Sequence, residues 1–371
     1  MPSKDSWGGP AACEPPFVEA LRDLGVDVVT EDYVFGDKDR PTPFLSRVSR
    51  VLKIAFRFRR LLKEHDFDLL FLNSAFDKRS ILRDSISLFI MQPRKTKVFL
   101  KVHGSQAHKF VGGSRAWQVL IRYLRRRVNA FGLHTRDELR SFIQLGFSST
   151  QFYRVRNAIT IGSEIPDGFE RNQKGSDGTF ELLFVARFIG SKGLLSTIRA
   201  CALLREKGIN FVLTCVGDGE DKKEAEALVE SLRLGDVVRF TGYIAEPDVT
   251  RLFLLSDIFI FPTSHAEGFP IVQFKAVACG LPIVTTRVRA AGEYLREPDN
   301  CLFCTADAEN VAEKAASLIH DQKLRETMSA SNFAYGSTLL PDAIATEYLS
   351  IFHAVIGGHL TPHTFEGEAS T

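Results

Sequence analysis

Two basic side chains near residue 190 have the types and spacing of a phosphate site. The apolar run 181–188 predicts a strand, Arg187 lies at its end, and Lys192 follows within a glycine-bounded turn. Arginine offers phosphate oxygens a planar fork of donors, and lysine adds a compact positive charge. Open α/β sheets bind ligands at the carboxyl ends of their strands. We therefore expect Arg187 and Lys192 to bind phosphate groups.

A carboxylate beside a helix start forms the second candidate group. The run 258–263 predicts a strand, Glu267 and Gly268 follow it, and 271–280 predicts a helix. The free N–H groups and the positive dipole end of a helix start favour an anion, and a glycine lets the backbone approach a ligand closely. A carboxylate beside a diphosphate does not help to bind phosphate. We expect Glu267 to accept hydrogen bonds from hydroxyl groups of the same ligand.

Residues 156–338 alternate between apolar strands and amphipathic helices. The predicted strands are 181–188, 210–217, 237–243, 258–263 and 282–286, and the predicted helices are 194–208, 221–235, 248–256 and 271–280. Continuous apolar strands separated by such helices are typical of a parallel sheet with both faces covered. This half is therefore predicted to be a Rossmann-like domain.

Residues 1–155 repeat this alternation less regularly. The predicted strands are 26–32, 68–73, 97–104 and 130–135, and the predicted helices are 15–25, 47–65, 80–91, 115–128 and 136–146. Gly8 and Gly9 come almost at once, with no strand before them. A doubly wound domain normally begins with a strand that leads into its first glycine turn. We therefore expect a truncated start and a first domain that lacks its first strand.

The length of 371 residues favours two domains. The predicted fold class is α/β, with two Rossmann-like doubly wound domains, 1–155 and 156–338, that face a cleft. A last helix within 339–357 is predicted to pack back on the first domain. Residues 358–371 are predicted to be a disordered tail.

Charge is spread unevenly along the chain. Residues 1–150 carry 26 Lys and Arg against 16 Asp and Glu, whereas residues 151–371 carry 21 against 29. The predicted helix 47–63 has apolar side chains on one face and lysines and arginines on the other. One hypothesis is that this basic face rests on an anionic membrane surface. The alternative is a helix packed on its sheet with a solvated basic face.

The composition indicates a globular protein with reduced thiols. The start of the chain is polar, without the apolar core of a signal peptide, and no stretch approaches the length of apolar residues that spans a bilayer. Three of the six cysteines, Cys201, Cys215 and Cys279, stand in apolar contexts. Cys301 and Cys304 have metal-type spacing but no second pair accompanies them. We expect a cytoplasmic protein without a metal site, able to associate with the inner face of the cell membrane.

Taken together, these motifs resemble those of the family 4 glycosyltransferases, which have the GT-B fold. The segments that carry the resemblance are 6-SWGGPA-11, 72-LNSAFDKRSILRD-84, 99-FLKVHGS-105, 185-VARFIGSKG-193, 216-VGDGE-220, 240-FTGY-243, 265-HAEGFP-270 and 278-ACGLPIV-284. Their combined spacing is specific, and they cover nearly the whole chain. The resemblance implies a retaining glycosyltransferase that moves a sugar from a nucleoside diphosphate sugar to a glycan or lipid-linked acceptor, in cell-surface polysaccharide biosynthesis. The first domain would be the acceptor side and the second would bind the donor.

The resemblance also implies roles for particular residues. Arg187 and Lys192 would stabilise the leaving nucleoside diphosphate, Glu267 would hold hydroxyl groups of the donor sugar, and His103 would contact that sugar near the transferring carbon. The remaining implied contacts are Gly8 and Gly9 of the first domain, Gly268, Phe269, Pro270, Ile271 and Val272 at the distal phosphate, and Gly217, Phe240 and Tyr243 beside the nucleobase.

Position 275 departs from the family pattern. The family has a second glutamate there, eight residues after the first, which takes the hydroxyl groups of the nucleotide ribose. This chain has Lys275 instead. An ammonium group only donates, so it cannot accept hydrogen bonds from both ribose hydroxyls. Lys275 could instead reach the diphosphate or pair with Glu267.

The implied reaction needs charge stabilisation. Breaking a glycosyl–phosphate bond builds negative charge on the diphosphate, which fixed cations and helix N–H groups stabilise. The resemblance implies that the nucleotide sugar is a co-substrate, that no metal or further cofactor takes part, and that a donor phosphate oxygen helps to take the acceptor proton. No nucleic-acid partner is expected.

Two other functions remain open. The first is a catalytically impaired glycosyltransferase-like protein that binds nucleotides or glycans, as Lys275 and the missing strand suggest. The second is a nucleotide-sugar 2-epimerase, which shares the two-domain architecture but lacks the Glu-Gly-Phe-Pro motif.

Overall fold

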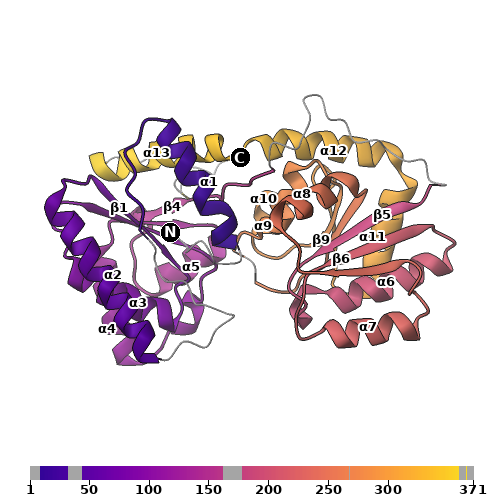
Figure 1. The fold of residues 1–371 in the computed structure, drawn as a ribbon, viewed down its shortest axis with the longest axis horizontal. Coiled ribbons are helices and arrows are strands. Elements are labelled where there is room, and N and C mark those ends of the chain that lie inside the picture. The colour runs from indigo at the N-terminus through magenta and orange to yellow at the C-terminus, as the bar shows by residue number, and fades with distance from the viewer. Residues whose placement is uncertain (1–8, 32–43, 162–177, 267, 359–364, 366–371) are drawn as a thin grey trace. The chain divides into compact units, whose positions relative to one another are not determined.

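A computed structural model describes the chain except for residues 1–8, 32–43, 162–177, 267, 359–364 and 366–371. The chain divides into two compact units (Figure 1). The first unit comprises Met1–Ala158 and Pro341–Thr371, and the second comprises Ile159–Leu340. The predicted boundaries, after residues 155 and 338, lie close to these. The last helix, α13 (Pro341–Gly357), belongs to the first unit.

The first unit is built on a parallel sheet of the order β1-β2-β3-β4 in its described part. Its strands are β1 (Leu69–Ser74), β2 (Lys97–Val102), β3 (Ala130–Leu133) and β4 (Phe152–Arg154). Its helices besides α13 are α1 (Gly9–Asp23), α2 (Phe44–Glu64), α3 (Lys78–Met91), α4 (Arg115–Arg127) and α5 (Arg136–Gln144), with short 3-10 turns at Ala107–Phe110 and Ser149–Gln151.

Alternate residues of the first sheet pack against different helices. Leu70 and Leu72 of β1 lie in one core with side chains of α2, α3, α4 and α5. Phe71, between them, contacts Phe17 of α1 and Phe352 of α13. Because successive side chains of a strand point to opposite faces, α1 and α13 cover the face that α2–α4 do not (Figure 1).

Two sequence predictions in the first unit differ from the structure. No strand is present over Val26–Glu31, and Asp32 lies outside the described residues. This segment has no neighbouring strand in the described part of the chain, where β1 pairs only with β2, so its valines are only half-buried or exposed. Of the predicted tail, only Gly358 and Phe365 are described, and Phe365 is buried in the first core, which differs from the predicted disorder.

The second unit contains a parallel sheet of the order β10-β9-β8-β5-β6-β7. Its strands are β5 (Phe180–Val185), β6 (Phe211–Val216), β7 (Val238–Gly242), β8 (Ile258–Phe261), β9 (Ile283–Thr286) and β10 (Leu302–Cys304). Its helices are α6 (Leu194–Glu206), α7 (Lys222–Ser231), α8 (Glu246–Leu255), α9 (Ile271–Ala278), α10 (Ala290–Tyr294), α11 (Ala308–His320) and α12 (Gln322–Ser337), together with the 3-10 turn η3 (Gly190–Lys192).

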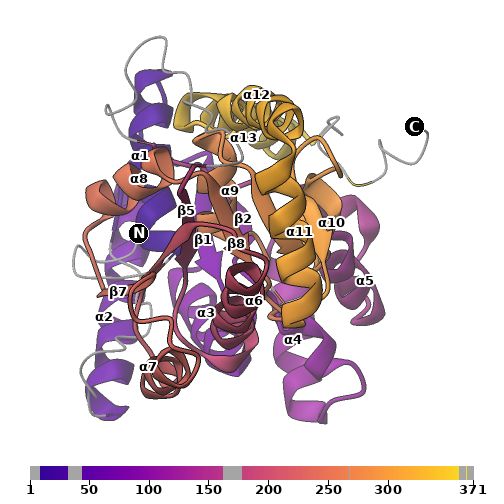
Figure 2. The same cartoon turned by 90° about the vertical axis from the view of Figure 1, so that its right-hand side faces the viewer.

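The helices of the second unit cover both faces of its sheet. Helices α6 and α7 lie on one face, with α11 packed against α6, and α8 and α9 lie on the other, with α12 packed against α9 (Figure 2). The five strands predicted here are all present. The apolar sequences of β5, β8 and β9 reflect burial on both faces, whereas the edge strand β7 has exposed residues.

The strand order of the second sheet reverses beside β5. The chain proceeds from β5 to β6 and β7 in one direction, then α8 crosses back to β8 on the other side of β5. In open α/β sheets, a ligand binds outside the carboxyl ends of the strands at such a switch point. The loops that follow β5 and β8, which contain Arg187, Lys192 and Gly268, lie at this point.

Among the described residues, no single helix is long and apolar enough to cross a bilayer. Helices α12 and α13 are long and apolar enough only when taken together, and the chain bends by 48° between them.

Candidate functional site

The loops after β5 and β8 are joined by hydrogen bonds. The carbonyl oxygen of Ser191 accepts from the backbone N–H of Ser264 at 2.8 Å and of His265 at 3.1 Å. It also accepts from the Thr263 hydroxyl at 3.1 Å. The turn that carries Lys192 is therefore fixed against the segment that leads to α9.

Two glycines allow the strand ends to approach one another. Gly193 has φ +83°, and a Cβ atom there would lie 2.5 Å from the Pro262 carbonyl oxygen. Gly217, after β6, has φ +137°, and a Cβ atom there would lie 1.8 Å from the Ala186 carbonyl oxygen. Only glycine fits both the conformation and the space at these positions. Gly217 therefore brings the end of β6 against the end of β5, next to Arg187.

Three positive charges act on the imidazole of His265, and one of them, Arg289, donates to the Ala266 carbonyl oxygen at 3.4 Å. Burial lowers the pKa of His265, and the positive charges of Lys192, Arg187 and Arg289 lower it further. Its Nδ1 lies 3.2 Å from the Ser191 hydroxyl. The ring therefore reports a positive potential at the switch point, where an anion would bind. Sequence analysis missed Arg289, although it follows β9 as Arg187 follows β5, and the same rule could have found it.

The segment before α9 is only partly described. Glu267, the predicted sugar-binding carboxylate, lies outside the described residues, as does Gly8. Gly268, Phe269 and Pro270 are buried, and the Phe269 ring stacks on Phe274 with centroids 3.8 Å apart. This stacking fixes the chain where α9 begins at Ile271, so the backbone of Ile271 and Val272 lies at the switch point, where the phosphate contact was predicted.

The ends of β6 and β7 lie beside each other. The N–H of Gly217 donates to the Gly242 carbonyl oxygen at 2.9 Å, and the Phe240 ring lies 6.1 Å from that of Phe188. Tyr243 is exposed directly after β7. The structure thus brings Gly217, Phe240 and Tyr243, the predicted nucleobase neighbours, to one end of the sheet.

Lys275 has a partner that the sequence did not indicate. Its side chain, on α9, is 3% exposed, and its ammonium group is bonded to Oε1 of Glu246 on α8. The sequence had suggested two partners for Lys275, the diphosphate and Glu267. The ion pair with Glu246 occupies the ammonium group instead.

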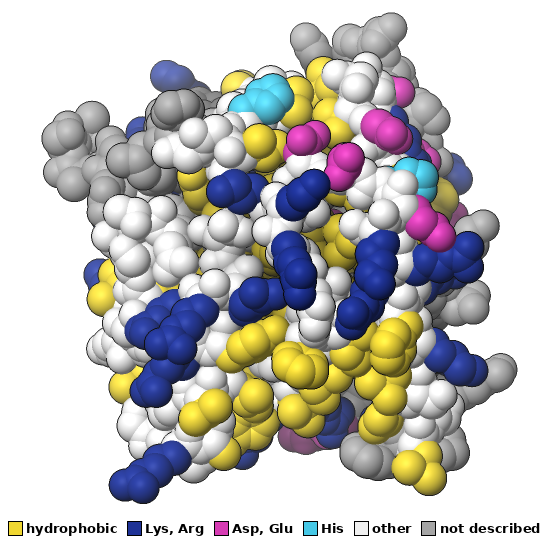
Figure 3. Space-filling view, turned by 90° about the vertical axis from the view of Figure 1, so that its left-hand side faces the viewer, with side chains coloured by type: hydrophobic (Ala, Val, Ile, Leu, Met, Phe, Trp, Pro, Cys, Tyr) yellow, Lys and Arg dark blue, Asp and Glu magenta, His cyan; other side chains and the backbone are white. Residues whose placement is uncertain are grey.

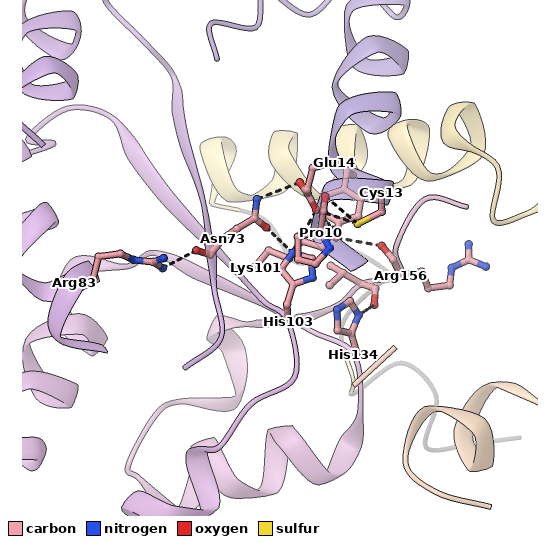
Figure 4. A network of polar contacts seen from close by, with 11 residues as sticks. Pro10, Cys13, Glu14, Asn73, Arg83, Lys101, His103, His134 and Arg156 are labelled. Atoms are coloured by element: carbon pink, nitrogen blue, oxygen red, sulfur yellow. Dashed lines mark hydrogen bonds and ion pairs between the residues drawn. The ribbon is translucent and has the colours of Figure 1, made fainter. Parts of the chain in front are cut away.

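The first unit contains a buried polar network at the ends of β1 and β2 (Figure 4). Lys101 of β2 donates to Oε1 of Glu14 of α1 at 2.8 Å, and both side chains are almost fully buried. His103, just after β2, places Nε2 3.3 Å from the same oxygen and 2.8 Å from Oδ1 of Asn73. The Asn73 amide nitrogen donates to Oε2 of Glu14 at 3.1 Å. Gly9 is the first residue of α1, the helix that positions Glu14.

The network determines where His103 carries its proton. Burial would raise the pKa of Glu14, but the charge of Lys101 and the hydrogen bond from His103 outweigh it and hold that pKa well below its usual range. An ionised Glu14 only accepts, so the Asn73 amide nitrogen must face it and Oδ1 must face His103. Nε2 of His103 is therefore the protonated nitrogen. Burial and the Lys101 charge lower the pKa of His103, which keeps the ring neutral with Nδ1 as an acceptor.

This arrangement predicts acid-sensitive stability. Burial lowers the pKa of both His103 and His134, and the Lys101 charge adds to this effect. As the pH falls below about 6.5, the unfolded chain takes up protons that the folded chain does not, so the unfolding free energy should decrease, by up to about 1.4 kcal/mol per pH unit for each histidine until its folded pKa is reached. Glu14 stays ionised in the folded chain over this range.

Urea unfolding of the full chain between pH 7.5 and pH 5.5 measures this effect. The variant His103→Gln should show a shallower loss of stability than the natural chain. Equal slopes for the two proteins would contradict the role given to His103.

The described residues contain no group of three or more His, Cys, Asp or Glu side chains that could hold a metal ion.

The family match lies within the second unit. Residues 167–333 match the family model described as glycosyl transferases group 1. This part of the chain is similar to the group 1 glycosyl transferases. It contains Arg187, Lys192, Glu267 and the α8–α9 pair.

Curated relatives are also glycosyltransferases. An N,N'-diacetylbacillosaminyl-diphospho-undecaprenol alpha-1,3-N-acetylgalactosaminyltransferase of Campylobacter jejuni is 26% identical over 361 residues, which cover 92% of this chain and 89% of the relative. A D-inositol 3-phosphate glycosyltransferase of Pseudarthrobacter chlorophenolicus is 30% identical over 52% of this chain and 48% of its own length. The chain spans about a third of the Escherichia coli colanic acid biosynthesis glycosyltransferase WcaL, 35% of its length at 29% identity.

Solved structures share the fold of this chain. Anabaena Alr3699/HepE, in complex with UDP and glucose, has a TM-score of 0.64 at 20% identity over 85% of this chain and 84% of its own. Sucrose-phosphate synthase from Thermosynechococcus elongatus has a TM-score of 0.70 at 16% identity over 95% and 94%. The predicted α/β two-domain GT-B fold is thus confirmed. The matched residues 167–333 lie in its second unit.

Proposed function

We propose that this protein is a retaining glycosyltransferase of family 4. It would move a sugar from a nucleoside diphosphate sugar to a glycan or lipid-linked acceptor in the synthesis of a cell-surface polysaccharide. The observation that carries the proposal is the position of Arg187 and Lys192 after β5, in the loop that the Ser191 carbonyl joins to the segment before α9, to which Arg289 also donates. A diphosphate matches this concentration of positive charge.

The chemistry follows from this charge. During transfer the bond between the anomeric carbon and the diphosphate oxygen breaks, the acceptor oxygen bonds to that carbon, and the acceptor proton passes to a phosphate oxygen of the donor. Negative charge grows on the diphosphate, and Arg187, Lys192 and the N–H groups at the start of α9 stabilise it. Glu267 would orient the donor sugar through its hydroxyl groups. In this proposal the cations neutralise the leaving group and no metal ion is needed.

Two roles in the proposal rest on the resemblance to family 4. Contact of His103 with the donor sugar is one, and the Nδ1 acceptor of a neutral imidazole suits a sugar hydroxyl. A lipid-linked acceptor is the other, and the name of the Campylobacter jejuni relative, which contains diphospho-undecaprenol, supports it.

A transfer assay tests the proposal. The full chain is incubated with UDP-, GDP- and ADP-sugars and with polyprenyl-diphosphate-linked and free glycan acceptors, with and without EDTA. We expect acceptor-dependent release of the nucleoside diphosphate, insensitivity to EDTA, and a product with the anomeric configuration of the donor.

Other results would favour the alternatives. Nucleotide binding without turnover on any acceptor would favour the binding protein, and restored turnover in Lys275→Glu would indicate an impaired transferase. Change of the sugar at carbon 2 without acceptor would favour the epimerase. Inverted configuration would contradict retention.

We also propose that the first unit rests on an anionic membrane surface. Seven apolar side chains on α2 and α3 are exposed: Leu45, Val48, Leu52, Phe56, Leu82, Ile86 and Phe89. Arg59 of α2 donates to the carbonyl oxygen of Ile90 at 3.1 Å, so the two helices lie side by side. We call these seven side chains the apolar stripe. They would enter the boundary between headgroups and acyl chains.

Basic side chains beside the apolar stripe favour an anionic membrane over a neutral one. Helices α2, α3 and α4 contain fifteen lysines and arginines and two acidic residues. Figure 3 shows apolar side chains gathered below a band of lysines and arginines on this face. Each basic residue near an anionic surface contributes about 1 kcal/mol. A cytoplasmic protein held at the inner face of the membrane by this surface would meet a lipid-linked acceptor there.

Vesicle flotation measures this association. The full chain should float with phosphatidylcholine vesicles that contain phosphatidylglycerol, should float less at high salt, and should not float with phosphatidylcholine alone. Phe56→Glu should weaken binding about tenfold or more, because a buried phenylalanine contributes about 1.5–3 kcal/mol. Leu255→Glu, at another exposed leucine on α8, is the matched control. No flotation with either vesicle, or equal loss in both variants, would contradict the proposal.

A further inference from the structure

The ion pair between Lys275 and Glu246 is unlike an ordinary surface pair. The Lys275 side chain is 3% exposed, whereas that of Glu246 is 57% exposed. Surface ion pairs usually join two mobile side chains and contribute little. Here Lys275 is a buried residue of α9, and its ammonium group is hydrogen-bonded to Oε1 of Glu246. Oε2 of Glu246 is not part of this hydrogen bond, so the pair presents an oriented carboxylate at the surface of the second unit.

Glu246 lies at the carboxyl edge of the second sheet. It is the first residue of α8 and stands four positions after the end of β7. Helix α8 crosses from β7 back to the switch point and contacts both β5 and α9. The carboxyl ends of parallel strands share one edge, so Glu246 is on the edge that carries Arg187 and Lys192. Its carboxylate bridges the β7 end and α9.

The chemistry of this group limits what it can bind. A carboxylate accepts hydrogen bonds and repels phosphate, so beside the cations it suits the uncharged, hydroxyl-bearing part of a phosphorylated ligand. Two oxygens of one carboxylate can accept from two neighbouring hydroxyl groups. A nucleoside diphosphate carries such a pair on its ribose.

The order of groups along the sheet favours the ribose over the transferred sugar. Arg187 and Lys192 follow β5, and α9 begins after β8, whereas the exposed Tyr243 and half-buried Phe240 lie at the end of β7. A nucleotide with its phosphates at β5 and β8 and its base near β7 has its ribose between these points. Glu246 follows β7 and pairs with Lys275 of α9, which follows β8, so it links the base end to the phosphate end.

We infer that Glu246 accepts hydrogen bonds from the ribose hydroxyl groups of the bound nucleotide. Lys275 is the positioning residue that holds its carboxylate. This inference rests on the proposed function, because it requires a nucleoside diphosphate at this edge of the sheet. It assigns a ligand contact to α8, a helix without any predicted site residue.

Calorimetric titration tests the inference on the full chain. The probes are UDP, GDP and ADP, each compared with its 2′-deoxy form. The natural chain should bind the tightest of the three at least about tenfold more tightly than its deoxy form, since a hydrogen bond to a charged group is lost. In Glu246→Gln this preference should fall several-fold. Lys275→Met should also reduce it, because the carboxylate is no longer held.

A matched variant separates the contact from a general charge effect. Asp248→Asn removes an exposed acidic group from the same first turn of α8. It should keep the full preference for ribose. If the preference is absent in the natural chain, or is equal in Glu246→Gln and Asp248→Asn, the inference is wrong while the proposed function stands. If none of the three diphosphates binds, both are wrong.

Discussion

Replacing Lys192 by alanine is expected to lower the turnover of sugar transfer by about 100- to 1,000-fold, the usual effect of removing one preorganised group that stabilises transition-state charge. Lys192 ends the turn η3, which the Ser191 carbonyl ties to the segment after β8. Its ammonium group lies 5.8 Å from the centre of the Phe261 ring. Because this charge is held in place before the bond breaks, its loss should affect the leaving diphosphate.

Steady-state kinetics at saturating donor measure the effect of Lys192→Ala. The loss should appear in kcat more than in KM, because the negative charge on the diphosphate grows in the transition state. Lys192→Arg should recover part of the rate, since it restores the charge. Lys207→Ala is the control, because Lys207 is an exposed lysine at the end of α6. Equal rates for the natural chain and Lys192→Ala would refute the role given to this cation.

The variant Lys101→Met is expected to lose about 3–5 kcal/mol of unfolding free energy, because it leaves the buried carboxylate of Glu14 without its cation. The Lys101 side chain is 1% exposed and that of Glu14 is 2% exposed, so water cannot replace the missing partner. The double variant Glu14→Leu/Lys101→Met removes both charges and should recover most of the loss. A buried ion pair contributes little net stability, yet it is costly to break on one side.

Urea unfolding of the first unit measures this difference. Trp117 on α4 packs against the first core and reports its unfolding, provided that Trp7 is replaced by phenylalanine in every variant. If the double variant is as unstable as Lys101→Met, the lost packing of the lysine stem, and not the unpaired charge, explains the effect.

Sequence patterns predicted the second unit more accurately than the first. Strands such as β5 and β8 are buried on both faces, so their apolar runs are continuous. The segment 26–31 has the valines of a strand, but strand formation depends on a neighbour to accept its hydrogen bonds. No local pattern records whether that neighbour exists.

The site residues, too, could be predicted only where local sequence determines their position. Arg187, Lys192, Gly193 and Gly217 could be found because each stands just after a predicted strand, where topology alone brings it to the binding edge. Glu246 and Lys275 are 29 positions apart, and Glu14 and Lys101 are 87 apart. Their pairing depends on how helices pack, which one sequence does not encode in its spacing. Lys275 therefore looked only like the loss of an acid, while the structure places an acid from another helix, Glu246, beside it.

Helix α13 has a consequence for biogenesis. It completes the aromatic layer on β1 and β2, where Tyr348 contacts Phe17 and Phe352 contacts Phe99. Yet it is made after the entire second unit. During synthesis on the ribosome, the first unit therefore cannot complete this aromatic layer until α13 has been made. The second unit can fold as soon as it emerges. A nascent chain stalled before residue 341 would expose these phenylalanines to chaperones, and translation of the last helix would release it from them.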